Sequence, residues 1–170
     1  MTATDLVALA VFVGALLGAA FADLRQYLIP NRYPAAIAIA YVIYATGHPL
    51  EQGLWGLAAG FVALVLGAVL LATGIMGGGD AKLLAAAMLW AGPSLATSFL
   101  TVTAFAGAAI ALAWLTPLRR LMPAAPSFPE HASPAPDSVS PLWARMSQPV
   151  PYGVAISVGG IHLAAVHAFN

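Results

Sequence analysis

The sequence contains no cysteine and very little charge. The absence of cysteine excludes disulfide bonds, thiolate chemistry and cysteine-based zinc sites. Charged residues make up 7% of the chain, whereas a typical soluble domain carries about 25%. The 6 Lys and Arg residues balance the 6 Asp and Glu residues, so the sequence provides no basic surface for a nucleic acid.

Apolar residues take the place of the missing charge. They make up 61% of the 170 residues, and the mean hydropathy is +0.90. A soluble domain of this length could not bury so much apolar surface. The composition therefore predicts an all-α polytopic membrane protein in contact with the lipid bilayer, folded as a single domain over residues 1–170.

Apolar runs separated by polar breaks predict about six transmembrane helices, since one span needs roughly 20 apolar residues. The expected spans are 6–22, 33–46, 54–75, two spans within 81–115 that Gly92-Pro93-Ser94 divides, and 150–169. The first run resembles the core of a signal peptide, but no Lys or Arg precedes it, so we expect it to be retained. The segment 116–148, rich in Pro, Ser and Ala, is expected to form a loop.

The basic residues indicate the orientation in the membrane. Six spans would place every Lys and Arg in connections on one side; these residues are Arg25, Arg32, Lys82, Arg119, Arg120 and Arg145. By the positive-inside rule this side is cytoplasmic, as is the loop at 116–148, and both termini lie outside. The sequence thus predicts a multi-pass protein of the inner (cytoplasmic) membrane.

Small residues and histidines carry no predicted chemistry. The third apolar run contains Gly53, Gly56, Gly60 and Gly67, a spacing that lets helices pack closely. The four histidines, His48, His131, His162 and His167, are scattered along the chain. We expect no metal site and no cofactor.

Two acidic residues, Asp23 and Asp80, each adjoin the cytoplasmic end of an apolar helix, where an ionisable group is costly and often functional. Asp23 could instead pair with Arg25 or Arg32, and Asp80 could cap the fourth helix. Because the run from Asp80 to Trp90 is too short to cross a membrane, this helix should begin within the preceding glycines or leave Asp80 in a hydrated recess.

The two carboxyl groups could also meet across the helices. Two carboxylates in close contact cannot both ionise, so the pair would share a proton. One group could then activate a water molecule while the other donates a proton to a carbonyl oxygen. Such a pair would hydrolyse a peptide bond without a metal, a thiol or an activated serine.

Three motifs resemble those of the type IV prepilin peptidases, which are membrane aspartyl proteases of the GxGD type. Gly77-Gly78-Gly79-Asp80-Ala81-Lys82-Leu83-Leu84 resembles the family signature G-x-G-D-x-K-L-L. Asp23 with Ile29-Pro30-Asn31 resembles the first aspartate block, D-x-x-x-x-x-I-P-N. Pro151-Tyr152-Gly153 resembles the C-terminal element P-[YF]-G. The three motifs occur in the family's order and extend over nearly the whole chain.

The resemblance implies a catalytic pair, Asp23 and Asp80, that removes the leader peptide from prepilins or pseudopilins on the cytoplasmic side. It also implies positions that bind or orient the substrate, namely Gly77, Gly79, Lys82, Pro151, Tyr152 and Gly153, although Lys82 could simply anchor its helix at the interface. Pilus or secretion assembly machinery is then a possible partner. The compact chain resembles the peptidases of tight-adherence (Flp-type) pilus systems. Because it lacks the cysteine tetrad of bifunctional members, we do not expect methyltransferase activity.

Two other classes of function stay open. In a small ion- or proton-coupled transporter, the aspartates would bind a cation along a pathway. A non-catalytic protein of pilus assembly would keep the motifs without the activity.

Overall fold

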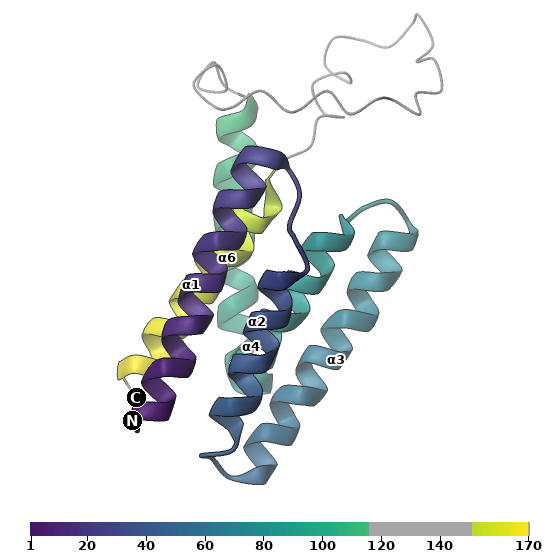
Figure 1. Cartoon of the computed structure of the whole chain (residues 1–170). Coiled ribbons are helices and arrows are strands. Elements are labelled where there is room, and N and C mark those ends of the chain that lie inside the picture. The colour runs from purple at the N-terminus through teal and green to yellow at the C-terminus, as the bar shows by residue number, and fades with distance from the viewer. Residues whose placement is uncertain (116–150, 170) are drawn as a thin grey trace, which may run out of the picture.

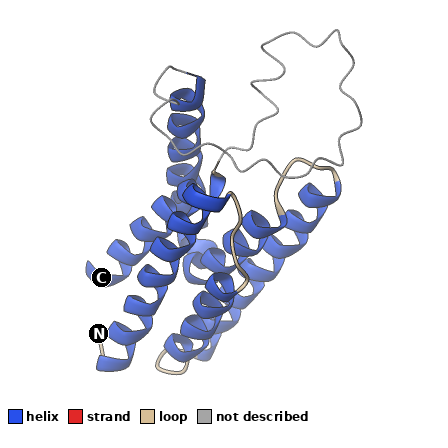
Figure 2. Ribbon diagram, turned by 45° about the horizontal axis from the view of Figure 1, so that its top comes forward, coloured by secondary structure: helices blue, strands red, loops and turns tan. Residues whose placement is uncertain are grey.

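The computed structural model describes residues 1–115 and 151–169, and in these residues it contains helices and no strand (Figures 1 and 2). The helices are α1 (Ala3–Gln26), α2 (Arg32–Ala45), α3 (Leu50–Ala72), α4 (Gly78–Leu115) and α6 (Tyr152–Phe169). The all-helical prediction is confirmed. The loop expected at 116–148 lies outside the described residues.

Helix α1 has clear signals at both ends. At its start, the Thr2 hydroxyl accepts the N–H of Asp5 at 3.2 Å, and the Asp5 carboxylate accepts the N–H of Thr2 at 2.7 Å. This reciprocal capping box satisfies two backbone donors that would otherwise lack partners. At the other end, Tyr27 adopts a left-handed conformation with φ of 50° and ends the helix. Asp23 therefore lies in the last turn of α1.

Helix α4 has two limbs, because Gly92 inside it is non-helical, with φ of 53°, and Pro93 follows. The first limb, 78–91, packs antiparallel to α3. A Cβ atom added at Gly67 would lie 2.9 Å from the Cβ of Ala81, and one added at Gly60 would lie 3.2 Å from the carbonyl oxygen of Ala85.

The second limb of α4, 93–115, packs antiparallel to α6. Phe99 lies against Gly159, and Gly107 lies against Ala155. The chain therefore runs along α3, turns at Gly92 and returns along α6, so that residues 78 and 115 lie toward the same end of the bundle (Figure 1). The break expected at Gly92-Pro93-Ser94 is where this turn occurs.

The prediction of six spans is not supported by the number of helices. The described residues form five helices, of which α1, α3, α4 and α6 are long and apolar enough to cross a membrane. Helix α2 has 14 residues and rises only about 21 Å, less than the roughly 30 Å of a hydrocarbon core. Helix α4 is counted once in these numbers, although its two limbs run in opposite directions on either side of Gly92. Both termini lie at one end of the bundle (Figure 1), and the prediction that they lie outside rests on the distribution of charge alone.

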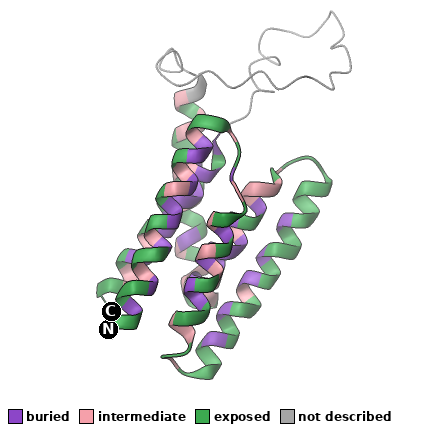
Figure 3. Cartoon of the chain, viewed as in Figure 1, coloured by how far each residue is buried: buried purple, intermediate pink, exposed green. Residues whose placement is uncertain are grey.

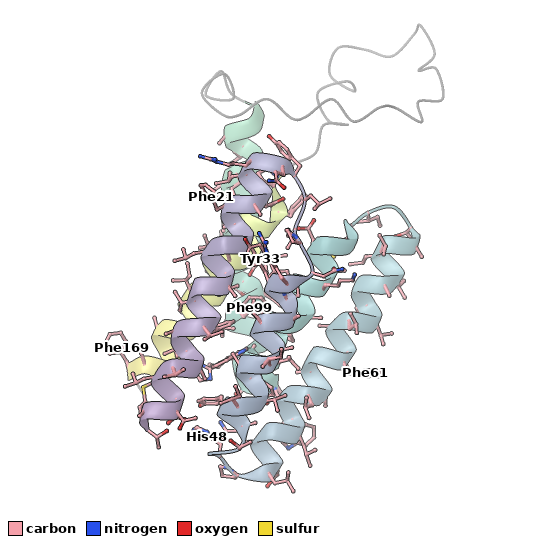
Figure 4. All side chains as sticks on the ribbon, viewed as in Figure 1. Phe21, Tyr33, His48, Phe61, Phe99 and Phe169 are labelled. Atoms are coloured by element: carbon pink, nitrogen blue, oxygen red, sulfur yellow. The ribbon has the colours of Figure 1, made fainter. Side chains whose placement is uncertain are left out.

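Helix α3 shows how the glycines serve the packing. Its buried residues are all small: Gly53, Gly56, Gly60, Ala63 and Gly67. A Cβ atom at Gly56 would collide with the Tyr41 hydroxyl, which also donates a 3.0 Å hydrogen bond to the carbonyl of Gly53. The prediction that these glycines allow close packing is confirmed. Figure 3 colours most of α3 as exposed, and Figure 4 labels one of its exposed large apolar side chains, Phe61, as expected for a helix that contacts lipid.

Candidate active site

Asp23 is a buried carboxylate at the end of the bundle opposite the two termini, here called the aspartate end. Its side chain is only 5% exposed. The backbone N–H groups of Gly153 and Val154, at the start of α6, interact with it. One of its oxygens, Oδ2, is fully buried and has no hydrogen-bond partner in the described part of the chain. Such atoms are uncommon among the buried polar side-chain atoms of proteins.

Asp80 is the third residue of α4 and lies in its first turn. The helix begins at Gly78, within the run of glycines, which confirms one of the two arrangements expected for it. Asp80 therefore lies inside the helix and not at its cap. A Cβ atom at Gly77 would lie 3.0 Å from Asp80 Oδ2, so the absence of a side chain there leaves room for the carboxylate. The half-buried Asp80 carboxylate interacts electrostatically with that of Asp23.

Ile29, in the connection between α1 and α2, is the contact that joins the three motifs. Its side chain is buried. A Cβ atom at Gly79 would lie 3.1 Å from Ile29 Cβ, and one at Gly153 would lie 2.6 Å from Ile29 Cδ1. The Cβ atom added at Gly153 would also lie 2.8 Å from Asp23 Oδ2. Glycine at both positions thus allows α4 and α6 to approach the same isoleucine, which keeps the two aspartates at one site.

Lys82 links the second motif to the first. Its side chain is exposed, and its ammonium group donates a 2.9 Å hydrogen bond to the Oδ1 atom of Asn31. This bond connects the N-terminal part of α4 to the start of α2. Lys82 therefore contacts the first motif, and this contact is compatible with a role as an interfacial anchor.

The other predicted positions also lie at the aspartate end. Pro151 is fully buried before α6, whereas Tyr152 is about half exposed, at 49%, and lies beside Gly107 of α4. All eight residues predicted for the site, from Asp23 to Gly153, thus meet here although they come from distant parts of the sequence. Their catalytic and substrate-binding roles stay predictions.

The two described arginines near the site, Arg25 and Arg32, do not bind the buried oxygen of Asp23. The guanidinium group of Arg25 lies over the ring of Phe21 at 4.3 Å, and that of Arg32 lies over Tyr33 at 4.9 Å. Figure 4 labels Phe21 near the aspartate end. Among the described residues Asp23 Oδ2 has no hydrogen-bond partner, so neither Arg25 nor Arg32 pairs with this atom.

Sequence reasoning missed the roles of three groups. The sequence identifies Ile29 and Asn31 only as members of the motif Ile29-Pro30-Asn31, and it gives no indication of the role of the Val154 backbone N–H. This motif is the signal in the sequence that could have indicated a role for Ile29 and Asn31. Their roles depend on contacts between segments about 50 and 120 residues apart, which a pattern along the chain does not reveal.

Comparison with known proteins gives one match. No curated protein and no solved structure is significantly similar to the chain. The model of the type IV leader peptidase family matches residues 10–112. This match spans more than half of the chain and includes Asp23, Asp80 and the connection that carries Ile29, while the element at 151–153 lies beyond it. The chain, a membrane protein with several apolar helices, therefore belongs to the type IV leader peptidase family.

Proposed function

We propose that the chain is a membrane-embedded aspartyl endopeptidase that removes the leader peptide from type IV prepilins or pseudopilins. The observation that carries the proposal is the pair of carboxylates at the aspartate end. Asp23 is buried, its Oδ2 atom has no hydrogen-bond partner within residues 1–115 and 151–169, and Asp80 is its electrostatic neighbour. A buried acid with a free acceptor atom beside a second acid is suited to hold a water molecule and share a proton.

In the proposed reaction the two carboxyl groups have complementary roles. The ionised group removes a proton from water, and the oxygen of that water attacks the scissile carbonyl carbon. The protonated group donates its proton to the carbonyl oxygen. When the tetrahedral intermediate collapses, the C–N bond breaks, the leaving nitrogen takes up a proton from the pair, and one hydroxyl group of the intermediate returns its proton to the pair as the carboxyl product forms. This sequence returns the dyad to its starting state with one proton shared.

Three glycines and an aromatic ring surround the pair. Gly77, Gly79 and Gly153 have no side chains, so the carboxylates and Ile29 can pack directly against their backbone. The half-exposed ring of Tyr152 lies next to them at the start of α6. We assign these residues, with Pro151, to positioning the substrate, and Lys82 to holding the site together through Asn31.

The proposed orientation places the aspartate end in the cytoplasm. Among the described residues Arg25, Arg32 and Lys82 belong to this end, while Asp5 and Glu51 belong to the other. A cytoplasmic bias of Lys and Arg then puts the active site at the inner face of the cytoplasmic membrane and both termini outside. There it would meet a prepilin leader before the mature subunit enters a pilus or secretion apparatus.

Co-expression with a candidate prepilin tests the proposal, with leader removal scored by gel shift. Asp23→Asn and Asp80→Asn should each reduce processing by at least about 100-fold, since each removes one partner of general acid–base catalysis. Glu51→Gln is the matched control, because it neutralises an exposed acid at the opposite end. It should process the prepilin like the unmodified protein.

The same experiment separates the competing functions. Normal processing by either aspartate variant, with the protein inserted in the membrane, would reject the catalytic pair. A chain that processes no prepilin in any form would favour an assembly role. Inhibition of the cleavage step by a chelator would require a metal mechanism instead.

A further inference from the structure

A cavity lies at the other end of the bundle, away from the aspartate pair. It lies between the start of α1, the turn joining α2 to α3, the Gly92 turn of α4 and the end of α6, and has a volume of about 740 Å³. This volume is within the range of small-molecule sites. The lining residues that matter for the argument are Asp5, Tyr44, His48, Trp55, Trp90 and His167. Figure 4 labels His48 at this end.

The cavity has a buried carboxylate in its wall. Asp5 is 5% exposed. Its Oδ2 atom accepts the N–H of Thr2 as part of the helix cap. Its Oδ1 atom points toward the turn between α2 and α3, 3.8 Å from where a Cβ at Gly47 would lie. Asp5 thus caps α1 with one oxygen and turns the other toward the segment that carries His48.

Two histidines add ring nitrogens to the same wall. The Nδ1 atom of His48 is 2.9 Å from the carbonyl oxygen of Tyr44, and that of His167 is 2.9 Å from the carbonyl oxygen of Leu163. Because a carbonyl only accepts, Nδ1 must carry the proton in each ring. In the neutral ring the Nε2 atom is then an acceptor. The cavity therefore contains at least three side chains able to accept hydrogen bonds.

Aromatic faces surround these acceptors. The ring of Tyr44 stacks on the ring of His48, with the two centroids 4.0 Å apart. The centroid of the Tyr44 ring is also 5.8 Å from that of the His167 ring. The centroid of Trp90 is 6.0 Å from that of His167. Apart from the histidines, the only group that could carry positive charge among the lining residues of the described chain is the α-amino group of Met1.

We propose that this cavity binds a primary ammonium group, supplied by the headgroup of a membrane lipid or by a free amine. The N–H groups would donate to Asp5 and to the Nε2 atoms of the histidines, and the aromatic rings would contribute cation–π attraction. An anion finds no Lys or Arg among the lining residues of the described chain. Within the described part, no three His, Asp or Glu side chains are grouped to hold a metal ion, which favours an organic cation.

Native mass spectrometry of the full-length protein in detergent tests the proposal. Phosphatidylethanolamine is the probe, and phosphatidylglycerol, which lacks the ammonium group, is the comparison. Phosphatidylethanolamine should bind at least about tenfold more tightly, the effect of one charge-assisted hydrogen bond. Displacement of the lipid by free ethanolamine would show that an unattached amine suffices, and retention would show that the lipid is the ligand. Equal binding of the two lipids overturns the proposal.

Variants locate the binding in the cavity. Asp5→Asn should weaken phosphatidylethanolamine binding about tenfold, whereas Glu51→Gln, an exposed acid on the neighbouring helix outside the cavity, should not change it. Because Asp5 also caps α1, Trp55→Leu serves as a second variant. Trp55 is 56% exposed, has no capping role and should give a weakening of about twofold to fivefold. Unchanged lipid binding by folded Trp55→Leu and Asp5→Asn proteins would reject this site.

Discussion

At the scale of single residues, Gly153 is where the constraints on the site converge. An added Cβ atom would lie 2.6 Å from Ile29 Cδ1 and 2.8 Å from Asp23 Oδ2, both closer than real Cβ atoms allow. Gly153→Ala should therefore push α6 away from the aspartates. Since a displacement of about 1 Å can cost about 100-fold in rate, we expect prepilin processing to fall by that order, measured by gel shift in membranes with equal amounts of protein.

Two further variants make the Gly153 result specific. Gly14→Ala is the matched control, because nothing lies within 4 Å of the added atom in the same bundle. It should leave processing unchanged and stabilise α1 by about 0.5–1 kcal/mol. Removing the Ile29 Cδ1 atom with Ile29→Val should partly restore the Gly153→Ala protein. Full activity of Gly153→Ala alone would show that the close contact does not control the site.

The Lys82–Asn31 hydrogen bond gives a different prediction at the same scale. If Lys82 acts by holding the Asn31 loop, Lys82→Met and Asn31→Leu should each lower processing about twofold to tenfold, the effect of one hydrogen bond. The double variant should be no worse than either single variant. The measurement is the initial rate of leader removal for the four proteins of the cycle. A much larger loss for Lys82→Met than for Asn31→Leu would instead mean that its charge acts directly on the aspartates.

At the scale of helices, the sequence predicted most of the element ends and the position of the turn within α4. The helices end at Gln26, Ala45 and Ala72, next to polar residues, glycines and prolines that a sequence shows directly. The break expected at Gly92-Pro93-Ser94 is where α4 turns. The sequence does not show which helices the two limbs pack against. The contacts that decide this, with α3 and α6, are tertiary and leave no local pattern.

The Gly92 turn is itself testable. Its φ of 53° lies in the region that residues with a side chain avoid, so Gly92→Ala should destabilise the protein by about 1–2 kcal/mol. Ser94→Ala, two residues on and exposed, should change the stability by no more than about 0.5 kcal/mol. Unfolding of both proteins in mixed micelles with increasing SDS would measure the difference. Equal stability would show that the chain can turn there without a positive φ.

At the scale of the whole molecule, the two ends of the bundle differ in chemistry. The aspartate end collects the three motifs and the basic residues of the described chain, Arg25, Arg32 and Lys82. The other end carries the exposed acid Glu51 and a cavity lined by Asp5, two histidines and aromatic rings. The motifs made the first end predictable from sequence. The second was not predictable, because Asp5, His48 and His167 are scattered along the chain and each has an ordinary structural role.

Two threonines allow the orientation of these ends to be measured. Thr46 and Thr73 are both exposed, each ends a helix, and each hydroxyl donates to the carbonyl three residues earlier, at 2.7 Å and 2.9 Å. Helix α3, whose 23 residues span about 35 Å, separates them. The chain has no cysteine, so Thr46→Cys and Thr73→Cys form a matched pair of single labelling sites.

A membrane-impermeant maleimide applied to intact cells should label Thr46→Cys and leave Thr73→Cys unlabelled until the membrane is opened. That result would follow if Arg25, Arg32 and Lys82 hold the aspartate end in the cytoplasm. The reverse pattern would place Asp23 and Asp80 outside, where they could not meet a leader peptide in the cytoplasm, and would remove the proposed side of cleavage. Labelling of both positions from outside would mean that α3 does not cross the membrane, since its two ends could then share one side.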